Sequence, residues 1–440
     1  MKAPPAEREA SGSPPKGGDY VRKAPKGAGQ LHEKVLDTSF MIVYNKLFFE
    51  FKAIMKLLLR RSYLMNTIAE ASIWPHFTPL TDPRQKGKIE HMLQDIIVIT
   101  LCAVISGADT WPDIYAYGKA KEDWLGTFTQ LPNGIPSADT FRRVFVLIDK
   151  DEFEDCFIGW VNAVEIVTEG QVIAIDGKTN RGTRDKASGL SPIHVVSAWA
   201  LENRITLGQV KTELKSNEIT AIPELLNLLE IKGCIVTIDA MGCQKAIAEK
   251  IIDKEADYVL ALKGNQANLY KDVQLFFDDA VECDFKNISS DSYETIDGDH
   301  GRVEIRRYYT IADIDQLAGK ENWKNINMIG MAISERHVGE KIETDCRFYI
   351  SSMENDAKKF GDAVRNHQGI ENSVHWVLDV GFREDESRKR KGDSAFNFSI
   401  LRHIAMNLLR KEKTVRGGMR TKRMKAGWSN AYLSTVLTTL

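Results

Sequence analysis

Three features that mark other protein classes are missing or scarce in this chain of 440 residues. No apolar segment approaches the ~20 residues that span a bilayer, and no secretory signal is recognisable, so we expect a cytoplasmic protein that does not contact a membrane. The six cysteines lack CxxC and Cys/His ligand spacing, which argues against a zinc site or a disulfide framework. The net charge of −2 gives no sign of a polyanionic partner, so the local distribution of charge has to decide that question.

Two apolar segments each end in an aspartate. Residues 172–175 are rich in β-branched side chains and lead into Asp176, and residues 234–238 lead in the same way into Asp239. Both patterns predict buried strands whose carboxylates leave the core at the strand end. If the strands are neighbours, the carboxylates meet at one sheet edge, where Mg²⁺ or Mn²⁺ would offset their repulsion. The alternative is that each aspartate caps a strand or the helix that follows it.

The N-terminal 64 residues differ in composition from the rest of the chain. Residues 1–35 hold five of the thirteen prolines and predict disorder, because such a composition buries too little apolar surface. Residues 36–64 are apolar and studded with Lys and Arg, which suits a helix that docks on a partner or a membrane surface, or a non-native extension. We therefore take residues 1–64 as an atypical extension.

Residues 65–165 predict a helical domain. Ser137 follows a Pro-Asn-Gly-Ile-Pro turn and predicts an N-cap for a helix that carries Arg142 and Arg143. A helix, a turn and a second helix with arginines suit DNA docking. A plain helical support domain with solvated arginines explains the pattern equally well.

Residues 166–415 predict a mixed α/β sheet flanked by helices. Strand and helix patterns alternate over residues 166–265, and a β-rich insertion is expected at about 270–345. Arg302 and Arg306 fall on one face of a strand in this insertion. They either hold phosphates or form an ordinary exposed charged face.

A helix expected over residues 358–378 places His367, Glu371 and His375 at positions i, i+4 and i+8, on one side. The helix also carries Arg365. An HExxH motif is absent, so a metalloprotease is not indicated.

Positive charge collects near the C-terminus. Residues 383–425 contain 14 Lys and Arg against 5 Asp and Glu, and the cluster Arg388, Lys389, Arg390 and Lys391 stands near its start. A basic region beside an acidic metal site is what an enzyme that acts on a polyanion needs. A solvated surface is the other explanation. We expect residues 416–440 to form a basic tail.

Distinctive blocks run in order from about residue 77 to about residue 412. The N-terminal blocks are LTDPRQKGKIEHML, GADTWPDI and NGIPSADTFRRVF, and the later blocks are IDGKTNRG, TIDAMGCQ, DYVLALKGNQ, HGRVEIRR, GIENSVHWVLDVGFRED and NFSILRHIAMNLL. Together they closely resemble the H-repeat-associated transposases, which are insertion-sequence transposases of the DDE class found beside Rhs elements in bacteria. Residues 1–64 lie outside the resemblance.

The resemblance implies a ribonuclease-H-like mixed sheet flanked by helices, with a β-rich insertion and a helical N-terminal domain. Asp176 and Asp239 match the two strand-end aspartates of the family, and Glu371 matches its helical glutamate. These three acids would hold two Mg²⁺ or Mn²⁺ ions ~3.5–4 Å apart, which stabilise an in-line displacement at phosphorus. The implied reaction is cleavage at transposon ends followed by strand transfer into target DNA. The resemblance also implies a bacterial protein that associates with the nucleoid and acts on DNA as a homo-oligomer.

Phosphate contacts are expected from Lys178, Arg365 and His367. One position departs from the family, which usually has Trp after the His of that helix, where this chain has Gln368. If that aromatic stacks on bases, this copy binds or cuts its ends less well. Gln368 and the unusual N-terminus leave open a catalytically dead DNA-binding relic, and a nuclease of the same fold without strand transfer is a separate alternative.

Overall fold

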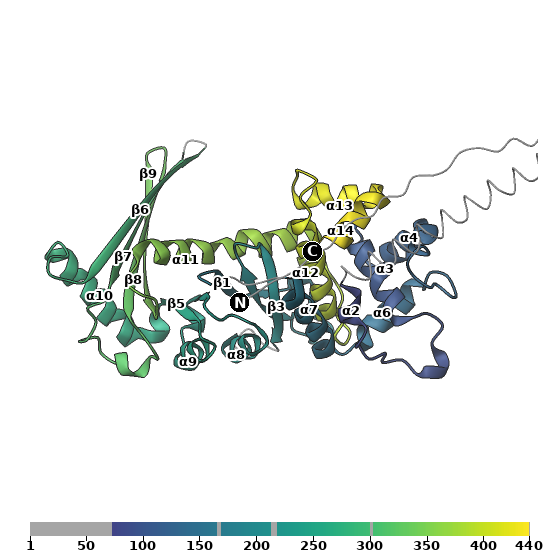
Figure 1. Cartoon of the computed structure of the whole chain (residues 1–440), viewed down its shortest axis with the longest axis horizontal. Coiled ribbons are helices and arrows are strands. Elements are labelled where there is room, and N and C mark those ends of the chain that lie inside the picture. Colours follow the sequence, from purple (N-terminus) through teal and green to yellow (C-terminus); the bar gives the residue numbers. More distant parts are fainter. Residues whose placement is uncertain (1–72, 165–168, 213–217, 300–301, 440) are drawn as a thin grey trace, which may run out of the picture. The chain divides into compact units, whose positions relative to one another are not determined.

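The computed structural model describes residues 73–164, 169–212, 218–299 and 302–439 (Figure 1). The expected extension of residues 1–64, with its amphipathic segment, lies outside the described residues. Within the described part of the chain, no helix is both long and apolar enough to cross a membrane.

Helices occupy the first described segment, where the apolar periodicity predicted them. α3 is buried on nearly every side, because a run of apolar residues leaves it no polar face. Ser137 caps α6 as predicted, and its Oγ accepts the Thr140 N–H at 3.1 Å. The helices are α2 (Trp74–Phe77), α3 (Leu93–Ile105), α4 (Trp111–Ala120), α5 (Glu122–Leu125), α6 (Ala138–Leu147) and α7 (Lys150–Val164).

A mixed sheet of nine strands follows in the described residues, in the order β3-β2-β1-β4-β5-β9-β8-β7-β6. β1 pairs antiparallel with β2 and parallel with β4, and β4 pairs parallel with β5. The carboxyl ends of β1 and β4 therefore lie side by side. The first five strands are β1 (Val172–Thr179), β2 (His194–Ala200), β3 (Ile205–Thr212), β4 (Ile235–Ile238) and β5 (Asp257–Leu262).

The expected β-rich insertion extends this same sheet, because β9 pairs antiparallel with β5. It begins with a helix that the sequence analysis missed, α10 (Ala267–Glu282), although Leu269, Val273, Phe277 and Ala280 repeat at helical spacing. The remaining strands are β6 (Ser290–Asp299), β7 (Arg302–Ile311), β8 (Met328–Val338) and β9 (Lys341–Ser351). β6 was also missed, because polar residues dominate it.

Helices cover both faces of the sheet. Figure 1 shows α8 (Glu218–Leu228) and α9 (Lys245–Asp253) on one side and α11 (Ala357–Ile370) on the other. α11 packs on β1, β4 and β7, so it spans the original strands and the insertion.

The C-terminal part joins the helical segment to the sheet. α12 (Ser394–Lys411) is buried along almost its whole length, and it packs against α3, α7 and β3. Residues 416–440, which we expected to be a basic tail, contain α13 (Met419–Trp428) and α14 (Asn430–Thr438). Lys422 and Arg423 are buried there, and their side chains donate to the backbone carbonyls of Leu409 and Val104. These charges stabilise the fold and are not available to a partner.

Candidate active site

Asp176 and Asp239 stand next to each other across two parallel strands, because Ile175 of β1 pairs with Ile238 of β4. β1 does not end at Asp176 as predicted, since it continues to Thr179, but burial falls there from buried to half-buried. The predicted approach of the two strands is therefore observed, with only the strand end misplaced.

Backbone amides hold both aspartates. The Gly177 N–H donates to Asp176 Oδ1 at 2.8 Å, and the Met241 and Gly242 N–H groups donate to Asp239 Oδ1 at 3.0 and 3.3 Å. Asp239 thus caps the short 3₁₀ turn that follows β4, as the capping alternative proposed. Capping uses one oxygen in these contacts, so it does not exclude a second role for the carboxylate.

Glu371 follows α11 directly and begins a π-helical turn, Glu371–His375. The Trp376 N–H donates to the Glu371 carbonyl, five residues back. The α-helix expected over residues 358–378 is therefore correct only as far as Ile370. The wider turn ends at His375, whose Nδ1 lies 3.6 Å from Asp176 Oδ2, so this segment reaches the first acid.

The carboxylates at this edge influence one another electrostatically. Burial, together with the charges of Asp239, Glu218 and Glu371, raises the pKa of Asp176 to about 7 against the opposing Gly177 hydrogen bond. Negative charge is therefore uncompensated at this edge. Oxygen donors with surplus negative charge suit a hard divalent cation. The described residues nevertheless contain no group of three or more His, Cys, Asp or Glu side chains already arranged to hold a metal.

A buried pair beside Asp176 was not predicted. His194 Nε2 lies 2.6 Å from Glu218 Oε1, and His194 Nδ1 lies 2.8 Å from the Thr179 hydroxyl. Gly177 makes room for the pair, because a Cβ there would lie 2.5 Å from His194 Nε2. The glycine after the first aspartate was the signal in the sequence that pointed to this close approach.

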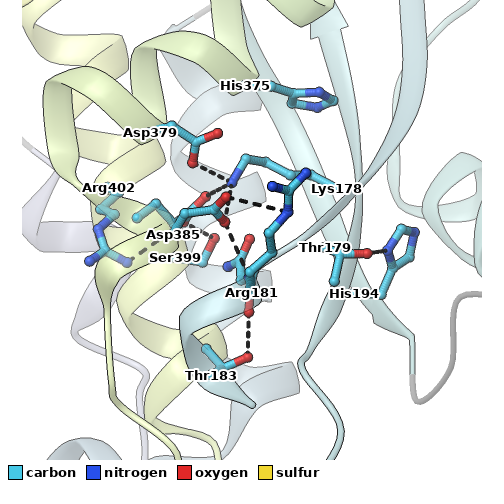
Figure 2. Close-up of polar contacts among 12 residues, drawn as sticks. Lys178, Thr179, Arg181, Thr183, His194, His375, Asp379, Asp385, Ser399 and Arg402 are labelled. Carbon is cyan, nitrogen blue, oxygen red and sulfur yellow. Dashed lines mark hydrogen bonds and ion pairs between the residues drawn. The ribbon is translucent and has the colours of Figure 1, made fainter.

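Lys178 is the centre of a second polar cluster (Figure 2). Its Nζ lies 2.7 Å from Asp379 Oδ1, 3.2 Å from Glu384 Oε2 and 3.5 Å from Asp385 Oδ1. Burial alone would raise the pKa of Glu384, but the charges of Lys178 and Arg402 hold it below its usual value. The amine expected to contact phosphate is thus engaged with three carboxylates, and only 11% of its side chain is exposed.

Comparison with known proteins identifies the chain. Residues 168–408 match the family described as "Transposase DDE domain", and residues 74–161 match the family described as "DDE_Tnp_1-associated". The chain belongs to the DDE transposase family. The resemblance seen in the sequence is therefore confirmed, and the helical segment is the part that accompanies the DDE domain.

Two curated relatives cover most of the transposase. "Putative transposase YncI" of Escherichia coli O157:H7 is 45% identical over 83% of this chain and 94% of its own length. "H repeat-associated putative transposase YhhI" of Escherichia coli K12 is 43% identical over 82% of this chain and 96% of its own length. Among solved structures, a piggyBac transposase synaptic complex with hairpin DNA aligns over 86% of this chain and 80% of that chain, at 12% identity and a TM-score of 0.38.

Most of the arginines expected to bind DNA form ion pairs in the transposase. Arg142 and Arg143 on α6 both pair with Asp139, at 2.5 and 2.6 Å. These pairs are exposed, so phosphates could displace them at little cost.

The insertion and α11 contribute a second set of paired arginines. Arg306 and Arg365 share Asp297, at 2.8 and 2.7 Å, and Arg302 lies 2.5 Å from Glu304. The structure thus brings together Arg306 and Arg365, which lie far apart in the sequence, around one acid.

His367 is half-buried, and its ring contacts a neighbouring strand. Its Nδ1 lies 3.1 Å from the Thr237 hydroxyl on β4, two residues before Asp239. Burial lowers the pKa of His367, against the charge of Asp239. In this conformation His367 helps to hold α11 against β4, so its Nδ1 is not directed at a phosphate.

The basic cluster at residues 388–391 divides into exposed and buried members. Arg388 and Lys391 are exposed, and Arg390 is half-buried. Lys389 is buried, where its Nζ donates to the Asp109 carbonyl at 2.7 Å and lies 3.7 Å from the centre of the Phe398 ring. Four consecutive basic residues in the sequence therefore do not form one continuous charged surface.

An exposed aromatic residue near the acids was missed. Trp376 follows the π-helical turn of Glu371 and His375, and 60% of the residue is exposed. Exposed tryptophans are uncommon without a partner, and nucleic-acid bases are frequent partners of such rings. The sequence signal was a tryptophan directly after the last histidine of the helix.

Proposed function

We propose that this transposase cleaves DNA at the ends of its element and joins the freed 3′ ends to target DNA, with Mg²⁺ or Mn²⁺ held by Asp176, Asp239 and Glu371. The observation that carries the proposal is the pairing of β1 with β4 beside Asp176 and Asp239, together with His375, on the turn that begins at Glu371, 3.6 Å from Asp176. Acidic side chains on two adjacent parallel strands and at the start of a π-helical turn suit a common cation. We assign the sheet to the ribonuclease-H-like class on its strand order.

Bound divalent ions would supply a nucleophile near neutral pH and stabilise the charge that develops on the attacking and leaving oxygens. The residues of the chain prepare the site in three ways. The amides of Gly177, Met241 and Gly242 orient the two aspartates. The π-helical turn presents Glu371, and the Lys178 cluster ties β1 to the segment that follows this turn.

Exposed basic side chains would hold the DNA over these acids. The exposed Lys and Arg between residues 383 and 425 support a polyanionic substrate, and Arg383, Arg388 and Lys391 lie at the start of this segment. The exposed ion pairs on α6 and the half-buried ion pairs on the insertion are further candidates. The protein is expected to act as a homo-oligomer, because strand transfer brings two element ends to one target.

The test is an end-cleavage assay with DNA that carries the element's own termini. Asp176→Asn and Glu371→Gln keep the size of each side chain and remove its charge, so we expect cleavage in Mg²⁺ to fall below detection. Asp253→Asn, at a partly exposed acid of α9 that pairs with Lys324, should cut normally. Normal cutting by Asp176→Asn or Glu371→Gln would refute the assignment of the acids.

The products distinguish the alternatives. Joined molecules of terminal and target DNA support a transposase, whereas nicked or linear products without joining identify a nuclease. Salt-dependent DNA binding with no metal-dependent cutting identifies a relic.

A further inference from the structure

A cavity of about 740 Å³ opens between the start of α4, the turn after β1 and the segment that follows the π-helical turns. Thr110 and Trp111 form one wall, Gly182 forms another, and Arg383 with residues 385–390 closes the third side. The cavity is within the size range of sites that accept a nucleotide-sized ligand. It lies beyond the carboxyl end of β1, because Arg181 is on the turn that leaves this strand, five residues after Asp176.

Basic side chains dominate the lining. Seven Lys or Arg residues line the cavity against four Asp or Glu residues. Four of the arginines are exposed at the rim: Arg181, Arg184, Arg383 and Arg388. For Arg184 and Arg388 the described residues provide no ion-pair partner, so their charges are free to meet an incoming anion.

The acids of the lining are already engaged. Asp109 lies 3.2 Å from Arg423 Nη2, and Asp113 forms the capping box of α4 with Thr110. Asp385 contacts Lys178 and accepts the Arg181 N–H at 3.1 Å, and Glu386 pairs with Arg383. They therefore do little to repel a negative ligand.

Arg402 provides a second, independent indication that the cavity accepts an anion. It lines the cavity from α12, and it is only 2% exposed. Its Nη1 lies 3.6 Å from Glu384 Oε1, but its Nε and Nη2 are buried and have no hydrogen-bond partner among the described residues. Buried guanidinium nitrogens without partners are costly, and Glu384 is shared with Lys178. An anion on the cavity floor would offset this charge.

We propose that this cavity, the arginine pocket, binds a backbone phosphate of the DNA strand that enters the active site. The proposal deepens the proposed function and rests on it, because DNA is the polyanion that this function brings to β1. Arginine binds phosphate through paired N–H donors, and several arginines converge here from separate segments. The pocket would hold the DNA strand beyond the end of β1, where Arg181 lies five residues after Asp176, and so set which phosphodiester reaches the acids.

The first measurement uses inorganic phosphate on the full chain. Sodium phosphate should raise the thermal unfolding midpoint above that in sodium chloride of equal ionic strength, because a ligand that binds only the folded state stabilises it. The double variant Arg184→Gln, Arg388→Gln should lose most of this rise. Arg402 is left intact, since its removal would also strip Glu384 of a partner.

The second measurement is DNA affinity in EDTA, so that binding is separated from cleavage. The same double variant should bind terminal duplex DNA about tenfold more weakly, and the slope of log affinity against log salt should fall by about 2. The matched control is Lys232→Gln, Lys286→Gln, which removes two exposed charges, each in an ion pair away from the pocket. The control should change affinity less than twofold.

Both results are required. A phosphate effect with unchanged DNA affinity would overturn the proposal and leave a free-anion site, and the absence of any phosphate effect would overturn it in favour of a water-filled pocket. A drop in the control equal to that of the variant would also overturn it. If the protein binds DNA as expected but does not cut it in Mg²⁺, the proposed cleavage is refuted while phosphate binding by the arginine pocket is retained.

Discussion

The amine of Lys178 lies 3.2 Å from the carboxylate of Glu384, across 206 positions of sequence. Glu384 also accepts the Ser399 hydroxyl at 3.1 Å and lies 3.6 Å from Arg402. The contact joins the strand that carries Asp176 to the segment that follows Glu371. Two of the three acids therefore depend on one buried charge cluster for their relative position.

Lys178→Met should destabilise the fold, because it removes the nearer cation from buried Glu384. Only Arg402, at 3.6 Å, would then balance that carboxylate. Removing one partner of a buried ion pair costs about 3–5 kcal/mol. Chemical denaturation measures this loss, and the double variant Lys178→Met, Glu384→Gln should lose clearly less than the sum of the single variants. Strictly additive losses would show that the two side chains do not interact.

Glu154 predicts an unusual pH dependence of stability. It is buried in α7, and burial, with the charge of Asp151, raises its pKa to about 9. The unfolded carboxyl titrates near 4.5, so between these values the folded state holds one more proton. Its contribution to stability therefore falls as pH rises, by up to about 1.4 kcal/mol per pH unit.

Glu154→Gln should remove this trend. The free energy of unfolding of the variant, relative to that of the natural chain, should therefore rise from pH 5 to pH 8. Denaturation at pH 5, 6.5 and 8 measures the gain. Glu255→Gln, at an exposed carboxylate paired with Lys232, is the control and should show no such trend. A constant difference between Glu154→Gln and the natural chain would contradict the prediction.

Gly177→Ala should displace the His194–Glu218 pair. The added Cβ would lie 2.5 Å from His194 Nε2 and 2.6 Å from Glu218 Oε1, so at least one side chain has to move. Overpacking of this kind costs about 1–3 kcal/mol, and end cleavage should fall because Asp176 adjoins the clash. Gly87→Ala, where a Cβ meets nothing within 4 Å, is the control for stability and cleavage. Equal behaviour of the two variants would argue against a role for the pair.

Trp376→Ala should weaken binding to terminal DNA with little effect on stability. Stacking of one base on an aromatic ring is worth about 1–3 kcal/mol, and exposed substitutions usually change stability by less than about 0.5 kcal/mol. Trp376→Phe keeps a ring and should retain most of the affinity. The comparison residue is Leu275, an exposed apolar side chain on α10, and Leu275→Ala should bind normally. Unchanged affinity in Trp376→Ala would exclude stacking there.

Local patterns in the sequence determined many elements and the pairing of two acids. The alternation of strand and helix patterns predicted over residues 166–265 is observed, and the side chains of β3 and β5 there suit a pleated, buried surface. The apolar segments before Asp176 and Asp239 likewise predicted strands, and these pair directly. Glu371 required the family resemblance, because a glutamate on a helix has no local signal of its own.

What the sequence could not supply was the partner of each charge. Arg388 and Lys389 are neighbours in sequence, but one is exposed and the other is buried beneath Trp111 and Phe398. The basic residues of α13 predicted an exposed tail, but the fold buries Lys422 and Arg423.

The sequence by itself thus determined which segments are apolar, which helices are capped and which strands end near an acid, because these depend on residues a few positions apart. Only the tertiary structure decided that Lys178 meets Glu384, that Gly177 makes room for His194 and that arginines from separate segments surround one cavity. Such contacts join residues tens to hundreds of positions apart, and their energies depend on burial that no local pattern records.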